Sequence, residues 1–354
     1  MFFKKTNEFV KGQKMTKNKT VARSMIVFAV MIFLTAGRVS ATSEKLIAAG
    51  TPIGVKFATD GVVITGIRPT DDEGRSPALE AGLKGGDVII EINGKKIVDI
   101  NSLSEEVGLS GGAVEIGFIR SGKRMKTTAT PEKDENGKNI LGLWVRDGAS
   151  GIGTLTFIDP ADLSFAALGH GICDADSGAL IPIRSGSVEE VMLTGITEGK
   201  AGSAGEVHGF FTGHSRGELT DNSVSGVMGK LDAIPESLEN EIYPIGTKND
   251  VSEGKAYIFT TVDGDGRKMY EIEISKISPE SKQKNFTVKV TDGELLEKTG
   301  GIIQGMSGSP IIQNGKLIGA ITHVLISDPT SGYGILTENM LDEETSRIMS
   351  DIAA

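Results

Sequence analysis

Three residues in glycine-containing segments have the side chains of a hydrolase that works through a covalent intermediate. Ser307 lies in GMSGSP, where glycines let a substrate approach the backbone closely. His170 lies between glycines in ALGHGI, and a histidine in such an accessible place can act as a general base near neutral pH. Asp292, in VTDGELLEKTGG, precedes the serine in the chain. Together they predict a nucleophile, its base and an acid that orients the base.

The sequence leaves open which aspartate is the orienting acid, because Asp292-Gly293 is also a common pattern for a hairpin turn. The aspartates that compete with Asp292 are Asp174, Asp176 and Asp328. A chain reversal before the serine would aim the N–H groups of Gly305 and Ser307 into one concavity. These two groups are therefore the predicted oxyanion hole.

The remaining histidines and the single cysteine predict neither a metal site nor a cofactor. A zinc ion would need convergent ligands, and His208, His214 and His323 occur without an HExxH helix or assisting thiolates. We interpret them as polar loop residues or as a satisfied strand histidine. Cys173 has no partner for an internal disulfide, and we expect it to be a small buried residue.

The residues after the serine indicate a β-hairpin. Two isoleucines at 311–312 precede Asn-Gly at 314–315 and an apolar run from 317 to 326, a pattern typical of two strands with a two-residue turn. Forty-seven glycines and many short apolar runs extend this pattern and predict a mainly β protein of two domains. The net charge of -10 argues against nucleic-acid binding, which needs a basic face.

The N-terminus has the pattern of a targeting segment. Basic residues crowd its first part, and residues 25–36 (MIVFAVMIFLTA) are then free of charge. This stretch is shorter than the ~20 residues of a comfortable membrane span, and the VSA at 39–41 would suit a signal peptidase. We expect residues 1–41 to be a signal or membrane-anchor segment, cleaved or retained, and residues 42–354 to lie outside the cytoplasm.

Residues 42–130 have the pattern of an α+β module. SPALEAGLKGGDVIIEING predicts a helix at 77–81 and a strand at 87–92 that ends in an Asn-Gly turn; a helix at 101–107 and a hairpin at 114–130 follow. This segment resembles the PDZ family. The resemblance implies that Ile53, Gly54 and Val55 form the loop whose N–H groups bind the carboxylate of a peptide.

The charged segment PEKDENGKN, residues 131–139, opens with proline and predicts an interdomain linker. Residues 140–354 then form a second β-rich domain. We expect its only tryptophan, Trp144, to lie in the core, because a large aromatic side chain gains most by burial.

The second domain resembles serine peptidases. The chain order His170, Asp292, Ser307 is that of chymotrypsin-like double β-barrels, and GMSGSP is similar to their GDSGGP motif. The segments GIGTLTFIDP, ALGHGI and DPTSGYGI accompany the serine segment behind a PDZ domain and an apolar N-terminal stretch. Together they resemble the SpoIVB peptidase family of endospore-forming bacteria.

That resemblance implies a serine endopeptidase secreted from the forespore into the space between the two membranes. It would cleave itself and a membrane-held regulator, and so release an intramembrane protease that activates a late sigma factor. His170, Asp292 and Ser307 would be base, orienting acid and nucleophile. The alternative is a non-catalytic envelope scaffold whose domains only bind peptides, and the joint presence of the three residues favours the enzyme.

Overall fold

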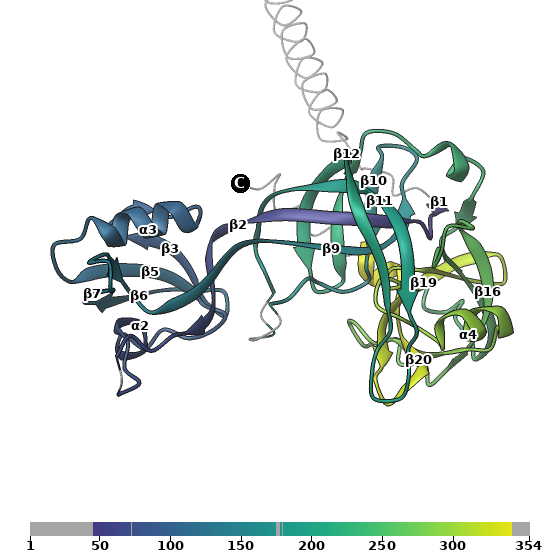
Figure 1. Cartoon of the computed structure of the whole chain (residues 1–354). Coiled ribbons are helices and arrows are strands. Elements are labelled where there is room, and N and C mark those ends of the chain that lie inside the picture. Colours follow the sequence, from purple (N-terminus) through teal and green to yellow (C-terminus); the bar gives the residue numbers. More distant parts are fainter. Residues whose placement is uncertain (1–44, 72, 175–177, 179, 342–354) are drawn as a thin grey trace, which may run out of the picture. The chain divides into compact units, whose positions relative to one another are not determined.

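The computed structural model describes residues 45–71, 73–174, 178 and 180–341. The expected signal or anchor segment, residues 1–41, and Asp176 lie outside the described residues. Within the described ranges, no helix is long and apolar enough to cross a membrane. The protein is mainly β, as predicted, with two barrels and a smaller α+β module (Figure 1).

The first barrel closes because β2 pairs with β9 as well as with β11. Its antiparallel ring runs β2, β11, β12, β13, β10, β9. The strands are β2 (Pro52–Ile67), β9 (Leu143–Ile158), β10 (Ser164–Ala167), β11 (Ile183–Thr197), β12 (Glu206–Ser223) and β13 (Gly226–Leu231). Next to β9 lie β1 (Lys45–Ala48) and then β14 (Ile242–Pro244), which the short η1 (Glu236–Leu238) precedes. Leu155, Phe165 and Val188 belong to the core of this barrel.

The second barrel is a closed ring in the order β15, β16, β17, β20, β19, β18. Its strands are β15 (Gly254–Thr260), β16 (Lys268–Ser275), β17 (Phe286–Val290), β18 (Pro310–Gln313), β19 (Lys316–Leu325) and β20 (Asp328–Leu336). Tyr270 and Ile272 of β16 alternate with more exposed residues and face the core beside Phe286. The predicted hairpin is confirmed as β18 and β19, joined by Asn314 and Gly315 with φ of 52° and 75°.

The α+β module contains two short helices and a sheet, with a core of its own (Figure 1). Its elements are α2 (Pro77–Glu80), β3 (Val88–Ile92), β4 (Lys95–Lys96), α3 (Ile100–Gly108), β5 (Val114–Arg120) and β6 (Lys123–Ala129). Ser76 caps α2 with proline at the first helical position, and Asp99 forms a capping box with Ser102 at the start of α3. These local signals explain why both helices lie where the sequence predicts them.

The domain boundaries differ from the prediction, because the module is inserted into the first barrel. Residues 52–58 of β2 pair with β9 and residues 54–59 pair with β11, whereas residues 62–63 pair with β3 of the module. Residues 131–139 are not a free linker. They contain β7 (Glu132–Lys133), which pairs with β8 (Asn139–Ile140), and the Asn139 amide donates to the carbonyl of Ser110 at 2.7 Å. Strands β2 and β9 each run through both the barrel and the module, so boundaries at residues 42 and 140 do not separate the two parts.

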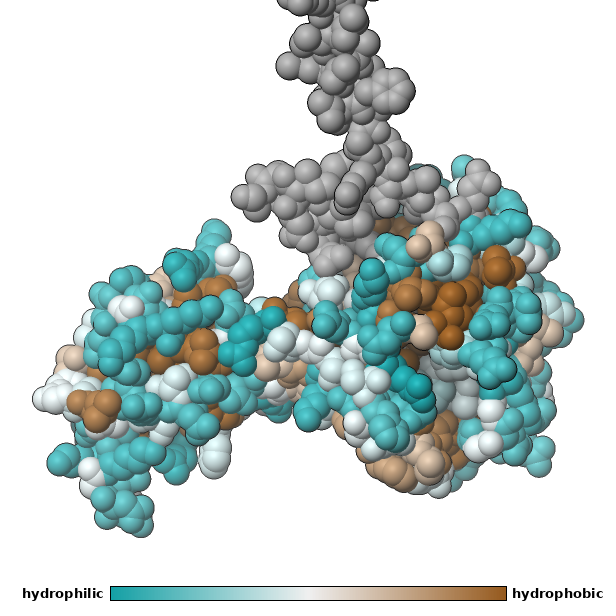
Figure 2. All heavy atoms as spheres, turned by 90° about the horizontal axis from the view of Figure 1, so that it is seen from above, coloured by the Kyte–Doolittle hydropathy of each residue, from teal (hydrophilic) through white to brown (hydrophobic). Residues whose placement is uncertain are grey.

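Hydrophilic side chains cover most of the face seen in Figure 2, with apolar patches between them. Trp144 is one of the exposed large side chains, with 58% of its surface accessible, so the prediction that it lies in the core is wrong. It lies in a strand of the module, where the guanidinium of Arg68 is 5.7 Å from the ring centroid.

Candidate active site

Ser307 lies in the loop between helix α4 (Gly293–Thr299) and β18, and strand β9 of the first barrel holds this loop. The carbonyl of Ser307 accepts a hydrogen bond from the Thr154 N–H at 3.0 Å, and the Thr154 hydroxyl donates to the Gly305 carbonyl at 2.7 Å. Gly308 has a φ of 97°, and a Cβ there would lie 2.1 Å from the Thr154 oxygen. The close approach of the two barrels therefore requires glycine after the serine.

His170 and Ser307 line one cavity of about 470 Å³, to which both barrels contribute residues. The Nδ1 atom of His170 lies 3.0 Å from the carbonyl of Gly171. Because a carbonyl only accepts, Nδ1 carries the proton and Nε2 is left to act as the base. Burial lowers the pKa of His170, so the ring is neutral near pH 7.

The hydroxyl of Ser307 donates to the backbone carbonyl of Thr322 in β19, with 2.5 Å between the oxygens. The serine is therefore held by the second barrel in this structure. A transfer of its proton to His170 requires the hydroxyl to turn away from that carbonyl.

The N–H groups of Gly305 and Ser307 are the predicted oxyanion hole. Within the described part of the chain, neither donates a hydrogen bond to another protein group. Gly305 has a φ of 100°, and a Cβ on it would lie 2.9 Å from the Cβ of Val207. Both residues line the cavity that contains His170, and N–H groups without a protein acceptor are the kind of donor that an oxyanion needs.

The structure does not bring Asp292 to this cavity. Its carboxylate caps α4 by accepting from the N–H groups of Glu294 at 3.0 Å and Leu295 at 3.1 Å. A third hydrogen bond comes from the N–H of Glu271 in β16. The assignment of Asp292 as orienting acid is therefore corrected: this aspartate begins a helix, and the local sequence DGELLEKT is that of an N-cap followed by helix formers.

The competing carboxylates that the structure describes do not take the role either. Asp328 accepts hydrogen bonds from Thr330 and Ser331 at the start of β20. Asp174 is buried, and its Oδ2 lies 3.8 Å from Nη1 of Arg146. The group that accepts a hydrogen bond from Nδ1 of His170 is the Gly171 carbonyl, a backbone group that side-chain types in the sequence do not reveal.

His323 is a cavity residue that sequence reasoning treated only as a strand histidine. Its ring centroid lies 4.7 Å from that of His170. Burial, with smaller contributions from His170 and Lys284, lowers the pKa of His323 to about 4. The only sign of it in the sequence is that His323 directly follows Thr322, whose carbonyl accepts the hydrogen bond from the Ser307 hydroxyl.

The other two histidines and the cysteine lie outside this arrangement or at its edge. His208 is bonded to Thr197 and His214 to Glu190, both on the β11–β12 hairpin. Among the described residues, no group of three or more potential metal ligands occurs. Cys173 is exposed and lines the cavity, so its expected burial is wrong.

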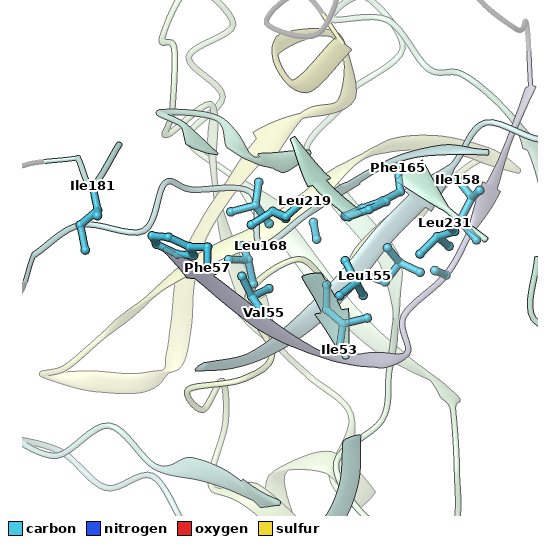
Figure 3. Close-up of a cluster of buried hydrophobic side chains, with 14 of the residues drawn as sticks. Ile53, Val55, Phe57, Leu155, Ile158, Phe165, Leu168, Ile181, Leu219 and Leu231 are labelled. Atoms are coloured by element: carbon cyan, nitrogen blue, oxygen red, sulfur yellow. The ribbon is translucent and has the colours of Figure 1, made fainter. Parts of the chain in front are cut away.

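Ile53, Gly54 and Val55 are not a peptide-binding loop. They lie in β2, where all three residues pair with β9, and Gly54 and Val55 pair with β11 as well. Ile53 and Val55 point into the core of the first barrel (Figure 3). This prediction is corrected because the backbone N–H groups of a strand that is paired on both sides already donate within the sheet. They are not available to a ligand.

A groove of about 160 Å³ lies instead between α3 and residues 139–145. Its apolar wall includes Leu103 and Val107 of the helix. Within the described residues, the buried N–H groups of Leu141 and Gly142 donate to no protein acceptor. Arg68, which also lines the groove, adds positive charge beside these donors.

Comparisons with known proteins give matches to proteases and to a PDZ domain. A Bartonella henselae protein named "Probable periplasmic serine endoprotease DegP-like" is 40% identical over 93 residues, 25% of this chain and 17% of that protein. The HtrA-type protease AlgW is similar in structure at 12% identity, with a TM-score of 0.35 over 86% of this chain and 66% of the other. The PDZ domain of an SdrC-like protein from Listeria monocytogenes has 24% identity and a TM-score of 0.21, over 24% and 87% of the two chains. This chain thus spans about a sixth of the length of the first relative.

Two six-stranded barrels with a serine, a histidine and two N–H donors at one cavity define a serine peptidase of the chymotrypsin-like fold, with an inserted PDZ module. The model of the SpoIVB peptidase S55 family matches residues 137–341, more than half of the sequence. The chain belongs to the SpoIVB peptidase S55 family.

Proposed function

We propose that the protein is a serine endopeptidase in which Ser307 attacks a peptide carbonyl. Nε2 of His170 takes the hydroxyl proton and later gives it to the leaving amine. The N–H groups of Gly305 and Ser307 stabilise the negative oxygen of the tetrahedral intermediate. The acyl-enzyme is then hydrolysed by water, with His170 again acting as the base.

The observation that carries this proposal is the shared cavity of Ser307 and His170 with two N–H groups that have no protein acceptor in the described structure. The Gly171 carbonyl orients the imidazole in place of a carboxylate. A neutral acceptor stabilises an imidazolium less than an ionised one does, so we expect a slower peptidase than one with a complete triad.

Labelling with a fluorophosphonate probe, measured by intact-mass spectrometry, distinguishes a serine endopeptidase from a non-catalytic scaffold. We expect the wild-type chain to label at Ser307 and both Ser307→Ala and His170→Ala to remain unlabelled. Ser309→Ala is the matched control: its hydroxyl is buried and donates to the Met306 carbonyl, so its loss removes one hydrogen bond and leaves the nucleophile. An unlabelled wild-type chain with native circular dichroism would favour the scaffold.

The setting of the reaction is proposed from the family resemblance. We propose that the enzyme acts outside the cytoplasm of a sporulating cell, cleaving itself and a membrane-bound regulator that leads to activation of a late sigma factor. Mass spectrometry of secreted wild-type and Ser307→Ala chains tests self-cleavage, because only the wild-type chain would lose peptides beyond those that a signal peptidase removes. Intact wild-type chains with a reactive Ser307 would remove self-cleavage from the proposal.

The groove beside α3 is proposed to bind the C-terminal end of a peptide. The N–H groups of Leu141 and Gly142 would hold the carboxylate, and the peptide would extend along β9. Fluorescence anisotropy should show binding of peptides with a free carboxylate and much weaker binding of the same peptides as C-terminal amides. Gly142 has a φ of 72° and a Cβ there would lie 2.6 Å from the Arg68 carbonyl, so Gly142→Val should abolish binding. Equal affinity for acids and amides would contradict this use of the groove.

A further inference from the structure

A second cavity of about 460 Å³ opens beside the active-site cavity. The two cavities share five lining residues, Ser150, Gly151, Ile152, Gln304 and Gly305. Gly305 carries one of the two proposed oxyanion donors. A peptide whose scissile carbonyl is bound at Gly305 therefore passes the mouth of the second cavity, and a side chain close to the cleaved bond can enter it.

Strand β12 forms one wall of this cavity and is joined to the oxyanion loop. The Gln304 N–H donates to the Gly205 carbonyl at 2.8 Å, and the Val207 N–H donates to the Gln304 carbonyl at 2.9 Å. The wall is thus built onto the backbone that precedes Gly305, which fixes its place relative to the proposed catalytic groups.

Charge in the two cavities is confined to one side chain. Among the described residues that line them, Glu206 is the only one of the types Asp, Glu, Lys or Arg. Within the described structure its carboxylate forms no ion pair and accepts no hydrogen bond. Phe210 and Phe211 line the same cavity and offer apolar surface beside it.

We propose that the second cavity is a specificity subsite that binds a lysine or arginine side chain of the substrate next to the scissile bond. The carboxylate of Glu206 pairs with the cationic end, and Phe210, on the same face of β12, contacts the aliphatic stem. The inference rests on the proposed peptidase function and adds the chemical class of the residue that this function recognises.

Cleavage of a peptide mixture with randomised positions on both sides of the bond, read by mass spectrometry, tests the subsite. We expect Lys and Arg to be enriched at one fixed position. Glu206→Gln should lower kcat/KM for Lys peptides relative to Gln peptides by about fivefold, the factor of one partly exposed ion pair. Glu206→Lys should shift the preference toward Asp and Glu at that position.

Glu218→Gln is the matched control, because Glu218 is an exposed glutamate of the same strand β12 that lines neither cavity. It should leave the preference unchanged. A basic preference that persists in Glu206→Gln, or no basic preference in the wild-type chain, would overturn the subsite. Loss of fluorophosphonate labelling at Ser307 in the wild-type chain would refute the peptidase function instead, and Glu218→Gln should be labelled at the wild-type rate.

Discussion

Replacement of Gly305 by alanine tests whether the geometry of the oxyanion loop governs reactivity. The new Cβ would lie 2.9 Å from Cβ and 3.1 Å from Cγ2 of Val207, both nearer than side chains tolerate without a shift. A backbone hydrogen bond to Gln304 holds Val207 in place. The alanine at position 305 must therefore move instead, and its own N–H group moves with it. The positive φ of Gly305 adds roughly 1–3 kcal/mol of backbone strain.

A displaced N–H no longer meets the oxyanion, and the loss of one such donor lowers kcat by about 10²–10³-fold. We expect the rate of fluorophosphonate labelling at Ser307 to fall in Gly305→Ala, since the phosphoryl oxygen of the probe uses the same donors. The melting temperature should fall by only a few degrees, because the strain is a minor part of a typical domain stability of ~5–15 kcal/mol.

The control variant Gly315→Ala separates the loss of reactivity from the loss of stability. Gly315 also has a positive φ, 75°, in the β18–β19 turn, but nothing lies within 4 Å of its added Cβ. Gly315→Ala should lose about as much stability as Gly305→Ala, while Ser307 is labelled at the normal rate. The double variant Gly305→Ala, Val207→Ala should regain part of the labelling rate, because the smaller side chain removes the Cγ contact. Normal labelling in Gly305→Ala, or equal loss in Gly315→Ala, would refute the assignment of Gly305 as an oxyanion donor.

The other predictions concern the base, the helix cap and the cavity histidine. Since burial lowers the pKa of His170 and only the neutral ring accepts a proton, kcat/KM should rise through a pKa below 6.5 and stay high at pH 7; a midpoint above 6.5 would contradict this. Asp292→Ala should reduce stability by about 0.5–2 kcal/mol, measured by urea unfolding, while the folded variant still labels at Ser307; an unreactive but stable variant would return Asp292 to catalysis. His323→Phe should keep the ring contact with His170 and most activity, whereas His323→Ala should lower kcat more than it raises KM; equal activity of the two would remove the positioning role.

The sequence predicted those elements that depend on local interactions. The Asn-Gly turn after Ser307, the cap of α2 at Ser76 and the capping box at Asp99 are each set by residues within a few positions, and each lies where it was expected. The serine and the histidine were also found, because glycines beside a reactive side chain are a visible local signal.

The errors concern contacts between distant parts of the chain. Asp292 was predicted to be the orienting acid because it lies between His170 and Ser307 in the chain. In the structure its carboxylate instead accepts hydrogen bonds from the first N–H groups of a helix. Ile53 was placed in the PDZ module because β2 continues into that module, although Asp60-Gly61, a common turn signal, lies where the strand leaves the barrel. His323 became a candidate only when closure of the second barrel brought β19 to the cavity.

Strand β9 joins the two sites of the protein through one continuous backbone. Near its start, residues 143–145 line the groove beside α3, and further along, Thr154 holds the carbonyl of Ser307. Both stretches pair with the same partner, β2, which is continuous over the same two regions. The module is therefore joined to the barrel by two paired strands, with a register shift between Ala58 and Val63 of β2, and not by a free linker at residues 131–139.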